Sequence, residues 1–321
     1  MSEMKYRWGH NRPYNAGANA MKKEYGYRVQ KLSVNAGFTC PNRDGNKSSG
    51  GCTFCDNQSF SPSYCHQNES ITDQLQRGIR FHEKRYRKAG AYFAYFQSFS
   101  NTYASVEILK KRYDEALAVE GVTGLIIGTR PDCISPELLD LISKYAEKYS
   151  ITVELGIESV YNESLQRVNR GHTFEDTLEA FKLLKEYSIR AGGHYILGLP
   201  GETRQMMLDS AKVLSSLTMQ TLKFHQLQII DGTRMGEEYK NNPESFQLFD
   251  LDDYVEFIAE YLTILNPGIV VERLAGEAPP AKNLGKHWGV RYDKVVQMVE
   301  NFMLEKGWYQ GMNYGELKNK T

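Results

Sequence analysis

Three cysteines lie close together near the start of the chain, in the segment CPNRDGNKSSGGCTFC. Eleven residues separate Cys40 from Cys52, and two separate Cys52 from Cys55. A structural zinc site normally has four Cys or His ligands, and no fourth ligand follows at a matching spacing. Three thiolates can instead hold a 4Fe-4S cluster and leave one iron open to a small molecule. The spacing favours such a cluster, with zinc or unrelated buried thiols as the alternatives.

Two further cysteines leave more than one interpretation open. Cys65, which is followed by His66, could complete a zinc site or bind a second cluster, or it could be a buried thiol without a role. Cys133 follows the third of the strands expected below, where packing and substrate handling are both compatible with a cysteine.

The composition indicates a reducing, intracellular setting. The five cysteines among 321 residues are too few, and odd in number, for a disulfide-stapled protein. The first residues lack the apolar core of a signal peptide, and no run of 18 apolar residues could span a membrane. We therefore expect a cytoplasmic protein with no membrane partner. The 39 basic and 39 acidic side chains cancel, so a nucleic-acid partner would need a local basic patch.

Short apolar or β-branched runs alternate with amphipathic helical patterns along most of the chain. The expected strands cover residues 28–34, 91–97, 124–130, 152–157, 191–197 and 221–227. Ser135 before Pro136, and Thr173 before Asp176, are typical of helix starts. Strands alternating with helices predict a parallel sheet of right-handed βαβ units. Because chemistry lies at the C-terminal ends of the strands in parallel barrels, the cysteine loop after the first strand is well placed.

The expected fold class is α/β, a partial (β/α)6 TIM-like barrel with a small C-terminal α/β extension. We expect an N-terminal extension over residues 1–25 and the barrel core over residues 26–242. The extension over residues 243–321 is expected to cover the barrel. It has a helical pattern at 251–265, a strand-like run at 269–273 and a final helix at 293–307.

A series of motifs in order between about residues 26 and 311 resembles a known family. They include YGYRVQKLSVNAGFTCPNRDG, GGCTFC, GTRPDC, VELGIES, RVNRGH, GLPGE and ERLAGEAPP. The chain resembles radical S-adenosylmethionine (SAM) enzymes of the branch that contains the elongator catalytic subunit and the coproporphyrinogen dehydrogenase. Within that branch it is most similar to the YhcC/YtqA family. The resemblance implies a radical SAM barrel in which Cys40, Cys52 and Cys55 bind a 4Fe-4S cluster whose open iron binds SAM.

The same resemblance assigns SAM contacts to residues at the strand ends and in the cysteine loop. Glu158 and Arg170 would bind the polar end of SAM, and the alternative for Glu158 is a carboxylate that only pairs with a neighbouring arginine. His194 would lie near the ribose, or it could be a hydrogen-bonded core residue. The full set of expected SAM-binding residues is Phe54, Gln97, Ser98, Thr129, Glu158, Arg170, His194 and Gly198. The catalytic residue on the substrate side stays unknown, with Cys133 and Tyr195 as weak candidates.

The resemblance also implies a substrate, because near relatives in the family modify tRNA bases. For the YtqA-type members, this modification concerns the side chain of the wobble uridine. Arg80, Lys84 and Arg87 belong to a basic segment that could contact phosphates, or they could form an ordinary solvated helix face. The alternatives are an oxidoreductase acting on a small, porphyrin-like or other molecule, and a non-catalytic metal-binding RNA adaptor. A flavodoxin or ferredoxin is expected as electron donor, and DNA is not expected as a partner.

Overall fold

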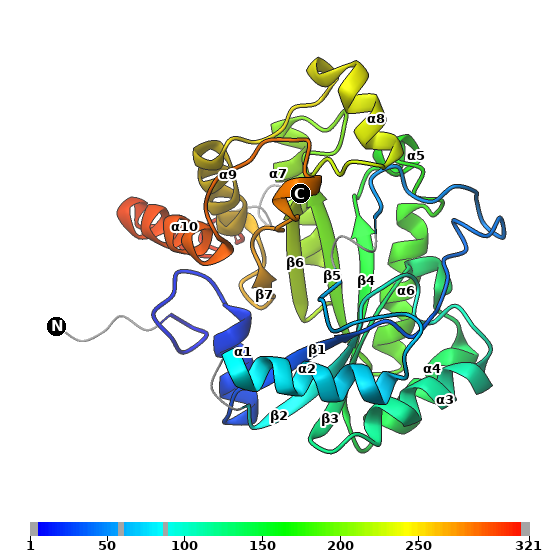
Figure 1. Ribbon diagram of the computed structural model, residues 1–321. Helices are drawn as coiled ribbons and strands as arrows, with labels where there is room; N and C mark the ends of the chain where they lie inside the picture. The colour runs from blue at the N-terminus through cyan, green and yellow to red at the C-terminus, as the bar shows by residue number, and fades with distance from the viewer. Residues whose placement is uncertain (1–5, 57–60, 86–88, 316–321) are drawn as a thin grey trace.

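The structure is a computed structural model that describes residues 6–56, 61–85 and 89–315. Within these residues, seven parallel strands form one sheet in chain order (Figure 1). The strands are β1 (Val29–Val34), β2 (Ala91–Phe96), β3 (Val122–Thr129), β4 (Ser150–Glu158), β5 (Arg190–Leu197), β6 (Thr221–Gln226) and β7 (Val270–Arg273). All six expected strands are present, and the strand-like run in the C-terminal segment adds β7 to the same sheet.

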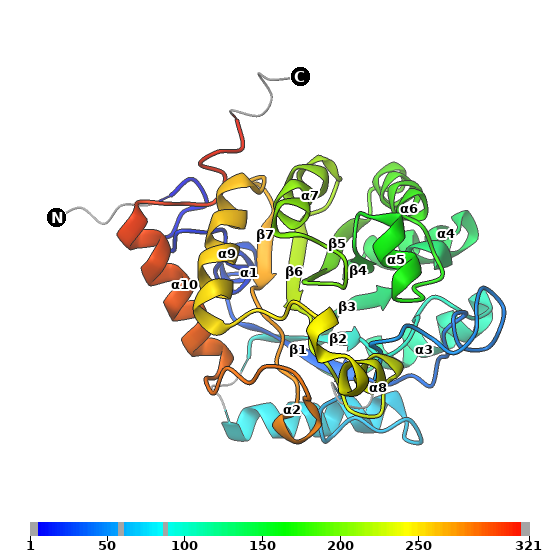
Figure 2. The same cartoon turned by 90° about the horizontal axis from the view of Figure 1, so that it is seen from above.

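Helices connect successive strands and lie outside the curved sheet (Figure 2). In chain order, the α-helices are α1 (Gly17–Tyr25), α2 (Ile71–Arg85), α3 (Val106–Leu117), α4 (Pro136–Ala146), α5 (Asn162–Arg167), α6 (Phe174–Glu186), α7 (Arg204–Ser216), α8 (Arg234–Asn241), α9 (Leu251–Ile264) and α10 (Tyr292–Lys306). The apolar core lies between the sheet and these helices. The predicted partial barrel of alternating strands and helices is therefore confirmed. No helix among the described residues is long and apolar enough to cross a membrane.

The two predicted helix starts have the expected caps. The Ser135 hydroxyl accepts a hydrogen bond from the Leu138 backbone N–H (3.3 Å) at the start of α4. At the start of α6, Thr173 and Asp176 form a reciprocal capping box. Such caps satisfy backbone N–H groups that the first helical turn leaves free, and each contributes about 0.5–2 kcal/mol.

The barrel is open between β1 and β7, which are the two edges of the sheet. Helix α1 packs against both of these strands and so covers the gap. Its first residue, Gly17, lies so close to β7 that a Cβ atom there would be 3.0 Å from the Glu272 Cα. Segments from both ends of the chain thus complete the barrel core, while the exact domain boundaries at residues 25 and 242 stay predictions.

Candidate active site

A cavity of about 920 Å³ lies inside the partial barrel. It is lined by residues that end or directly follow strands, such as Gln97 after β2, Thr129 at the end of β3 and Glu158 at the end of β4. The loop that carries the three cysteines forms another part of the wall. The parallel strands and the cysteine loop therefore deliver their polar side chains to one enclosed space, as parallel barrels generally do.

The cysteine loop is irregular, but two neighbouring elements hold its backbone. The Thr53 N–H donates to the Val168 carbonyl (2.9 Å) just after α5, and the Thr53 carbonyl accepts from the Met235 N–H (2.9 Å) in α8. The side chain of Asn169 donates to the carbonyls of Ser49 and Gly51 (3.0 and 2.8 Å). Asn169 itself adopts a left-handed φ of +52°, which asparagine tolerates better than most residues. These contacts fix the loop against the segment after β4.

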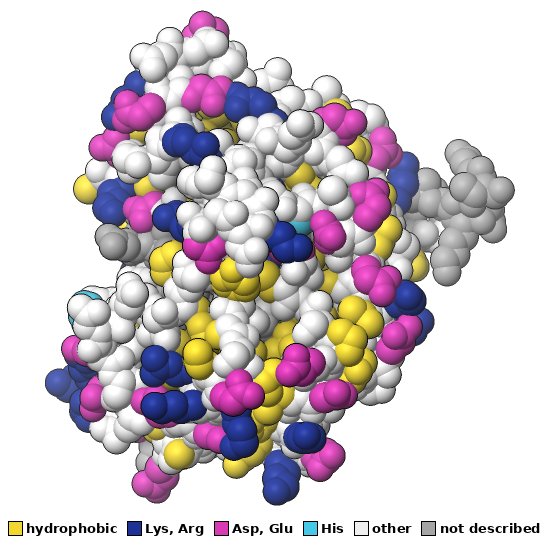
Figure 3. All heavy atoms as spheres, turned by 90° about the vertical axis from the view of Figure 1, so that its right-hand side faces the viewer, with side chains coloured by type: hydrophobic (Ala, Val, Ile, Leu, Met, Phe, Trp, Pro, Cys, Tyr) yellow, Lys and Arg dark blue, Asp and Glu magenta, His cyan; other side chains and the backbone are white. Residues whose placement is uncertain are grey.

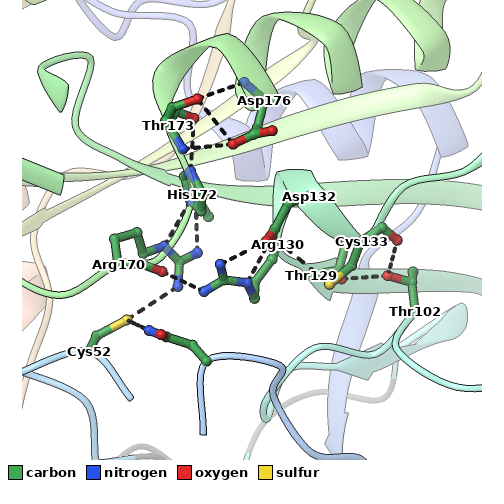
Figure 4. A network of polar contacts seen from close by, with 12 residues as sticks. Cys52, Thr102, Thr129, Arg130, Asp132, Cys133, Arg170, His172, Thr173 and Asp176 are labelled. Carbon is green, nitrogen blue, oxygen red and sulfur yellow. Dashed lines mark hydrogen bonds and ion pairs between the residues drawn. The ribbon is translucent and has the colours of Figure 1, made fainter. Parts of the chain in front are cut away.

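Two N–H groups lie beside the Cys52 sulfur. The Asn42 amide lies 3.5 Å from the Cys52 sulfur, and the Arg170 guanidinium lies 3.6 Å from it (Figure 4). Burial and the neighbouring Cys52 raise the pKa of the Cys55 thiol to about 11, so metal binding must displace its proton. Among the residues that the structure covers, no three His, Cys, Asp or Glu side chains are grouped to hold a single metal ion. Three thiols, two of them bordered by N–H donors, fit a thiolate-bound iron–sulfur cluster, in which hydrogen bonds to sulfur are common.

Glu158 and Arg170 face each other beside the cysteines. A Glu158 carboxylate oxygen lies 3.3 Å from the Arg170 guanidinium, and both residues line the cavity. Glu158 has a φ of +63° at an irregularity in the β4–β5 pairing. This backbone conformation is energetically costly for a residue other than glycine, and such residues cluster at functional sites. Arg170 also donates to the carbonyl of Gly156 (2.8 Å), where a Cβ atom would collide with the guanidinium. The carboxylate does pair with an arginine, and both charges border the space where SAM is expected.

His172 is a positioning residue that the sequence interpretation missed, although it lies in the RVNRGH motif. Its Nδ1 lies 2.9 Å from the Thr173 carbonyl and its Nε2 lies 3.0 Å from the Arg170 Nε (Figure 4). The Arg170 N–H must donate, so Nε2 accepts and Nδ1 carries the proton. Burial and the adjacent Arg170 charge lower the pKa of His172 to about 3, which keeps the ring neutral. A neutral His172 therefore orients Arg170.

Arg130 is a second residue whose role was not expected from the sequence. It is only 2% exposed, and it donates to both carboxylate oxygens of Asp132 (2.8 and 3.0 Å) and to the Arg170 carbonyl (2.7 Å). The bidentate pair neutralises Arg130 and ties the segment after β3 to the segment after β4. The Thr129 hydroxyl, which lines the cavity, is held 2.6 Å from the Thr102 hydroxyl.

The other expected SAM contacts are divided by their position relative to the cavity. Phe54, Gln97, Ser98 and His194 line it, and Gln97 accepts a hydrogen bond from Ser33 (3.2 Å). Gly198 does not line it, but occupies a turn with a φ of +88° where a Cβ atom would contact Phe249.

The weaker cysteine and tyrosine candidates lie elsewhere. Tyr195 is fully buried in the core and does not line the cavity, and Cys133 does not line it either. Burial raises the pKa of Cys133 to about 12. Cys65 is buried and donates to the Gln74 side chain (3.1 Å), as a thiol with a structural role does.

The basic residues proposed for RNA contact are not brought to the cavity. Arg80 and Lys84 are exposed in the second half of α2, and Arg87 lies outside the described residues. Helix α2 leads from the C-terminal end of β1 back to the start of β2, so its second half lies toward the N-terminal ends of the strands. Glu83 of this half accordingly accepts a hydrogen bond from Tyr92 near the start of β2. Contact of Arg80 and Lys84 with RNA stays a prediction, and the direction of the helix places these residues away from the cavity.

Deeper in the barrel, four charged side chains form a cluster that the sequence did not predict. It comprises Lys31 (β1), Glu154 (β4), Lys223 (β6) and Glu272 (β7), here called the charge quartet. Lys223 lies 2.6 Å from both Glu154 oxygens and 3.4 Å from Glu272, and Lys31 lies 2.5 Å from Glu272. Burial alone would raise the pKa of Glu154, but Lys223 and His194 hold it well below its usual value.

His194 joins the charge quartet through its side chain. Its Nε2 lies 2.7 Å from a Glu154 oxygen, and its ring stacks on His225 at a centroid distance of 5.8 Å. The Nε2 atom is thus already engaged, and only the remainder of the ring faces the cavity. His194 lines the cavity, as expected of a residue near the ribose, and it is also hydrogen-bonded inside the barrel, as expected of a core residue.

Comparison with known proteins identifies the fold and its signature. The family model of the radical SAM superfamily matches residues 39–214, which include the cysteine loop and β2 to β5. The chain belongs to the radical SAM superfamily. The model of the radical SAM C-terminal domain matches residues 219–305. The resemblance stated from the motifs is therefore confirmed, and members of this superfamily use a 4Fe-4S cluster and SAM.

The relatives extend over most of this radical SAM chain. "Uncharacterized protein YtqA" of Bacillus subtilis is 34% identical over 302 residues, covering 94% of this chain and 92% of its own length. A protein named tRNA uridine(34) acetyltransferase, of Methanocaldococcus infernus, is 28% identical over 187 residues. That match covers 57% of this chain and 33% of the relative.

Among solved structures, archaeal Elp3 of Methanocaldococcus infernus with an N-terminal deletion superimposes with a TM-score of 0.67 at 20% identity. It covers 90% of this chain and 67% of that one, and shows that the two share a fold.

Proposed function

We propose that this protein binds a 4Fe-4S cluster through Cys40, Cys52 and Cys55 and reductively cleaves SAM. The observation that carries the proposal is that these cysteines line one cavity together with Gln97, Thr129, Glu158 and Arg170. The cluster, when bound, supplies one electron to the SAM sulfonium, which breaks a C–S bond and yields methionine and a 5′-deoxyadenosyl radical.

The chain's own residues would bind and orient SAM. Arg170, held by His172 and Gly156, presents a guanidinium that suits the carboxylate of the methionine part. Glu158 can accept a hydrogen bond from the amino group beside it. Thr129 and the backbone around Phe54 are available for the ribose and the adenine. The enclosing strands exclude bulk water from a reactive radical.

We further propose that the substrate is a tRNA base, in the side chain of the wobble uridine. The support comes from the relative named tRNA uridine(34) acetyltransferase, with which this chain shares 187 aligned residues. A base must reach the cavity from its mouth, so the proposed contacts lie at the rim rather than on α2. The cations tested are Lys47, which is exposed in the cysteine loop, and Lys282, whose partner Asp56 lines the cavity.

Three measurements test the proposal. Reconstituted wild-type protein with dithionite should form 5′-deoxyadenosine and methionine from SAM, and the Cys52→Ala protein should not. The tRNA of a deletion strain should contain an altered wobble nucleoside. Double charge reversal at Lys47 and Lys282 should weaken tRNA binding and make it less dependent on salt, because fewer phosphate contacts then release counterions. The matched double reversal at Arg80 and Lys84 measures whether α2 also contacts tRNA.

One observation favours a small-molecule substrate as the second candidate. On the face shown in Figure 3, basic and acidic side chains alternate and form no single-sign patch. Nucleic-acid-binding surfaces usually concentrate positive charge. If both double reversals leave tRNA binding unchanged, and the deletion strain accumulates a metabolite while its tRNA is normal, the small-molecule function replaces the tRNA function.

A further inference from the structure

The active-site cavity extends past the charge quartet to the open side of the barrel. A smaller cavity of about 320 Å³ shares six lining residues with it: Ser33, Pro62, Tyr95, Gln97, Glu272 and Arg273. Arg273 is the last residue of β7 and pairs in register with Lys223 of β6. Of the proposed SAM contacts, Gln97 alone lines the smaller cavity, so most of this region stays available to another ligand.

Arg273 is an unbalanced positive charge in this wall. Within the charge quartet, two lysines face two glutamates at 2.5 to 3.9 Å, so their charges cancel. Arg273, which is half-buried, makes neither a hydrogen bond nor an ion pair with any residue in the described part of the chain. A guanidinium has five N–H donors and keeps its charge at any physiological pH, so its donors are free for a ligand.

Tyr292 supplies a second free donor beside Arg273. Its hydroxyl oxygen accepts the Leu274 N–H (3.2 Å), and within the described residues its own hydrogen has no acceptor. Burial raises the pKa of Tyr292, and the nearby charge of Arg273 works against that rise. Both side chains line the large cavity. The closest candidate to compete for them, Glu277, also lines the cavity but accepts the Tyr292 backbone N–H and forms no ion pair with Arg273.

The backbone that carries Arg273 is held in place. The Gln226 side chain donates to the Gly276 carbonyl (3.0 Å) and accepts from the Gly276 N–H (2.9 Å). A Cβ atom at Gly276 would lie 2.8 Å from the His225 ring, so this close approach requires glycine. A ligand would therefore meet donors that are already fixed, which reduces the entropy cost of binding.

We propose that Arg273 and Tyr292 form an anion site that holds a carboxylate or phosphate group of the substrate. The guanidinium fork matches two oxygens of either group, and the hydroxyl adds a third donor. The inference rests on the proposed function in one respect, namely that the bound anion belongs to the substrate of the radical reaction. The site positions that substrate inside the barrel beside SAM.

Crystals of the reconstituted holoprotein, soaked separately with para-bromobenzoate and with selenate, test the site without an activity assay. An anomalous bromine or selenium peak beside Arg273 in the wild type, and its loss in Arg273→Gln, is the expected result. A peak from para-bromobenzoate alone identifies a carboxylate, and one from selenate alone a phosphate. No peak from either probe, or a peak that persists in the variant, overturns the proposal.

Two further variants and a check on Arg273→Gln control the soaks. Arg273→Gln must keep the wild-type iron content and melting temperature, and Arg204→Gln removes an exposed arginine that pairs with Glu260 away from the cavity. Tyr292→Phe should lower the affinity for the bound probe severalfold, and Arg273→Gln should lower it roughly tenfold to a hundredfold. The proposed function is tested separately from the anion site: it fails if the wild-type protein does not cleave SAM.

Discussion

Lys223→Met should destabilise the protein far more than the removal of an ordinary lysine. The change keeps most of the apolar stem but removes an ammonium group that is 2.6 Å from both Glu154 oxygens and 3.2 Å from the Tyr95 hydroxyl. Lys223 is 5% exposed and Glu154 is 2% exposed, so water cannot replace the lost partner. Removing one member of a buried ion pair typically costs about 3–5 kcal/mol.

The geometry places the expected loss near the lower limit of that range. Glu154 keeps His194 at 2.7 Å and Lys31 at 3.9 Å after the substitution, so its charge stays partly balanced. We therefore expect a loss of about 3 kcal/mol in the free energy of unfolding. In the Lys223→Met, Glu154→Leu double variant neither charge remains unpaired. Its loss should be smaller than the sum of the two single losses by about 2 kcal/mol, the coupling expected of residues in contact.

Urea denaturation of the apoprotein, followed by circular dichroism under anaerobic conditions, measures these differences. Lys212→Met is the matched control, because Lys212 pairs with Asp209 at 2.6 Å on the exposed face of α7. Such a surface pair contributes about 0–1 kcal/mol. The reasoning is refuted if Lys223→Met is as well tolerated as Lys212→Met, or if the double variant loses the full sum of the single losses.

Three shorter predictions concern the cluster, SAM and pH. Cys52→Ala should abolish both the visible absorption of the reconstituted cluster and SAM cleavage, whereas Cys65→Ala should retain both. If Cys52→Ala forms 5′-deoxyadenosine at the wild-type rate, the ligand assignment is disproved. Arg170→Ala should lower SAM affinity roughly tenfold or more, since hydrogen bonds to charged groups contribute about 1.5–3 kcal/mol. Equal affinities of this variant and the control Arg190→Ala, which removes a half-buried arginine paired with Glu24, would rule that role out in an anaerobic titration. Lys223 and His194 hold the pKa of Glu154 below its ordinary 4.5, against the effect of burial. The contribution of Glu154 to stability is therefore present above pH 4.5 and is lost as the pH falls below 4.5. Glu154→Gln should flatten the acid limb of stability against pH, and an unchanged limb would contradict this.

The sequence predicted the parts of this structure that short-range patterns determine. The strands and capped helices follow from periodicity and from local pairs such as Thr173 and Asp176. The cysteine loop was recognisable because its three residues occupy one short segment. The direction of α2 could also have been derived from the alternation of strands and helices, and would have placed Arg80 and Lys84 away from the cavity mouth.

The charge quartet could not be predicted in the same way. Its members come from four strands, and Lys31 and Glu272 are separated by more than two hundred residues. A lone charged residue in a strand normally indicates a solvent-facing position, because burying an unpaired charge is costly. Only the closure of the sheet shows that these four charges point into the barrel and pair with one another. Arg130 was missed for the same reason, because it meets the Arg170 carbonyl from 40 residues away in the sequence. His172 lies two residues from Arg170 in the RVNRGH motif and could have been recognised from the sequence.

The pattern of pairing inside the barrel is itself informative about ligands. Arg130 is balanced by Asp132, the charge quartet balances itself, and Arg170 faces Glu158 and the cysteine sulfurs. Within the described residues, Arg273 is the cavity arginine to which neither a carboxylate nor a carbonyl is assigned. A half-buried cation gains free energy when an anion replaces the water around it. Arg273 therefore contributes to the binding of an anion and not to the stability of the fold. The two ends of the cavity therefore differ in purpose: one is lined by groups that suit a cluster and SAM, and the other holds a charge that its own protein does not neutralise.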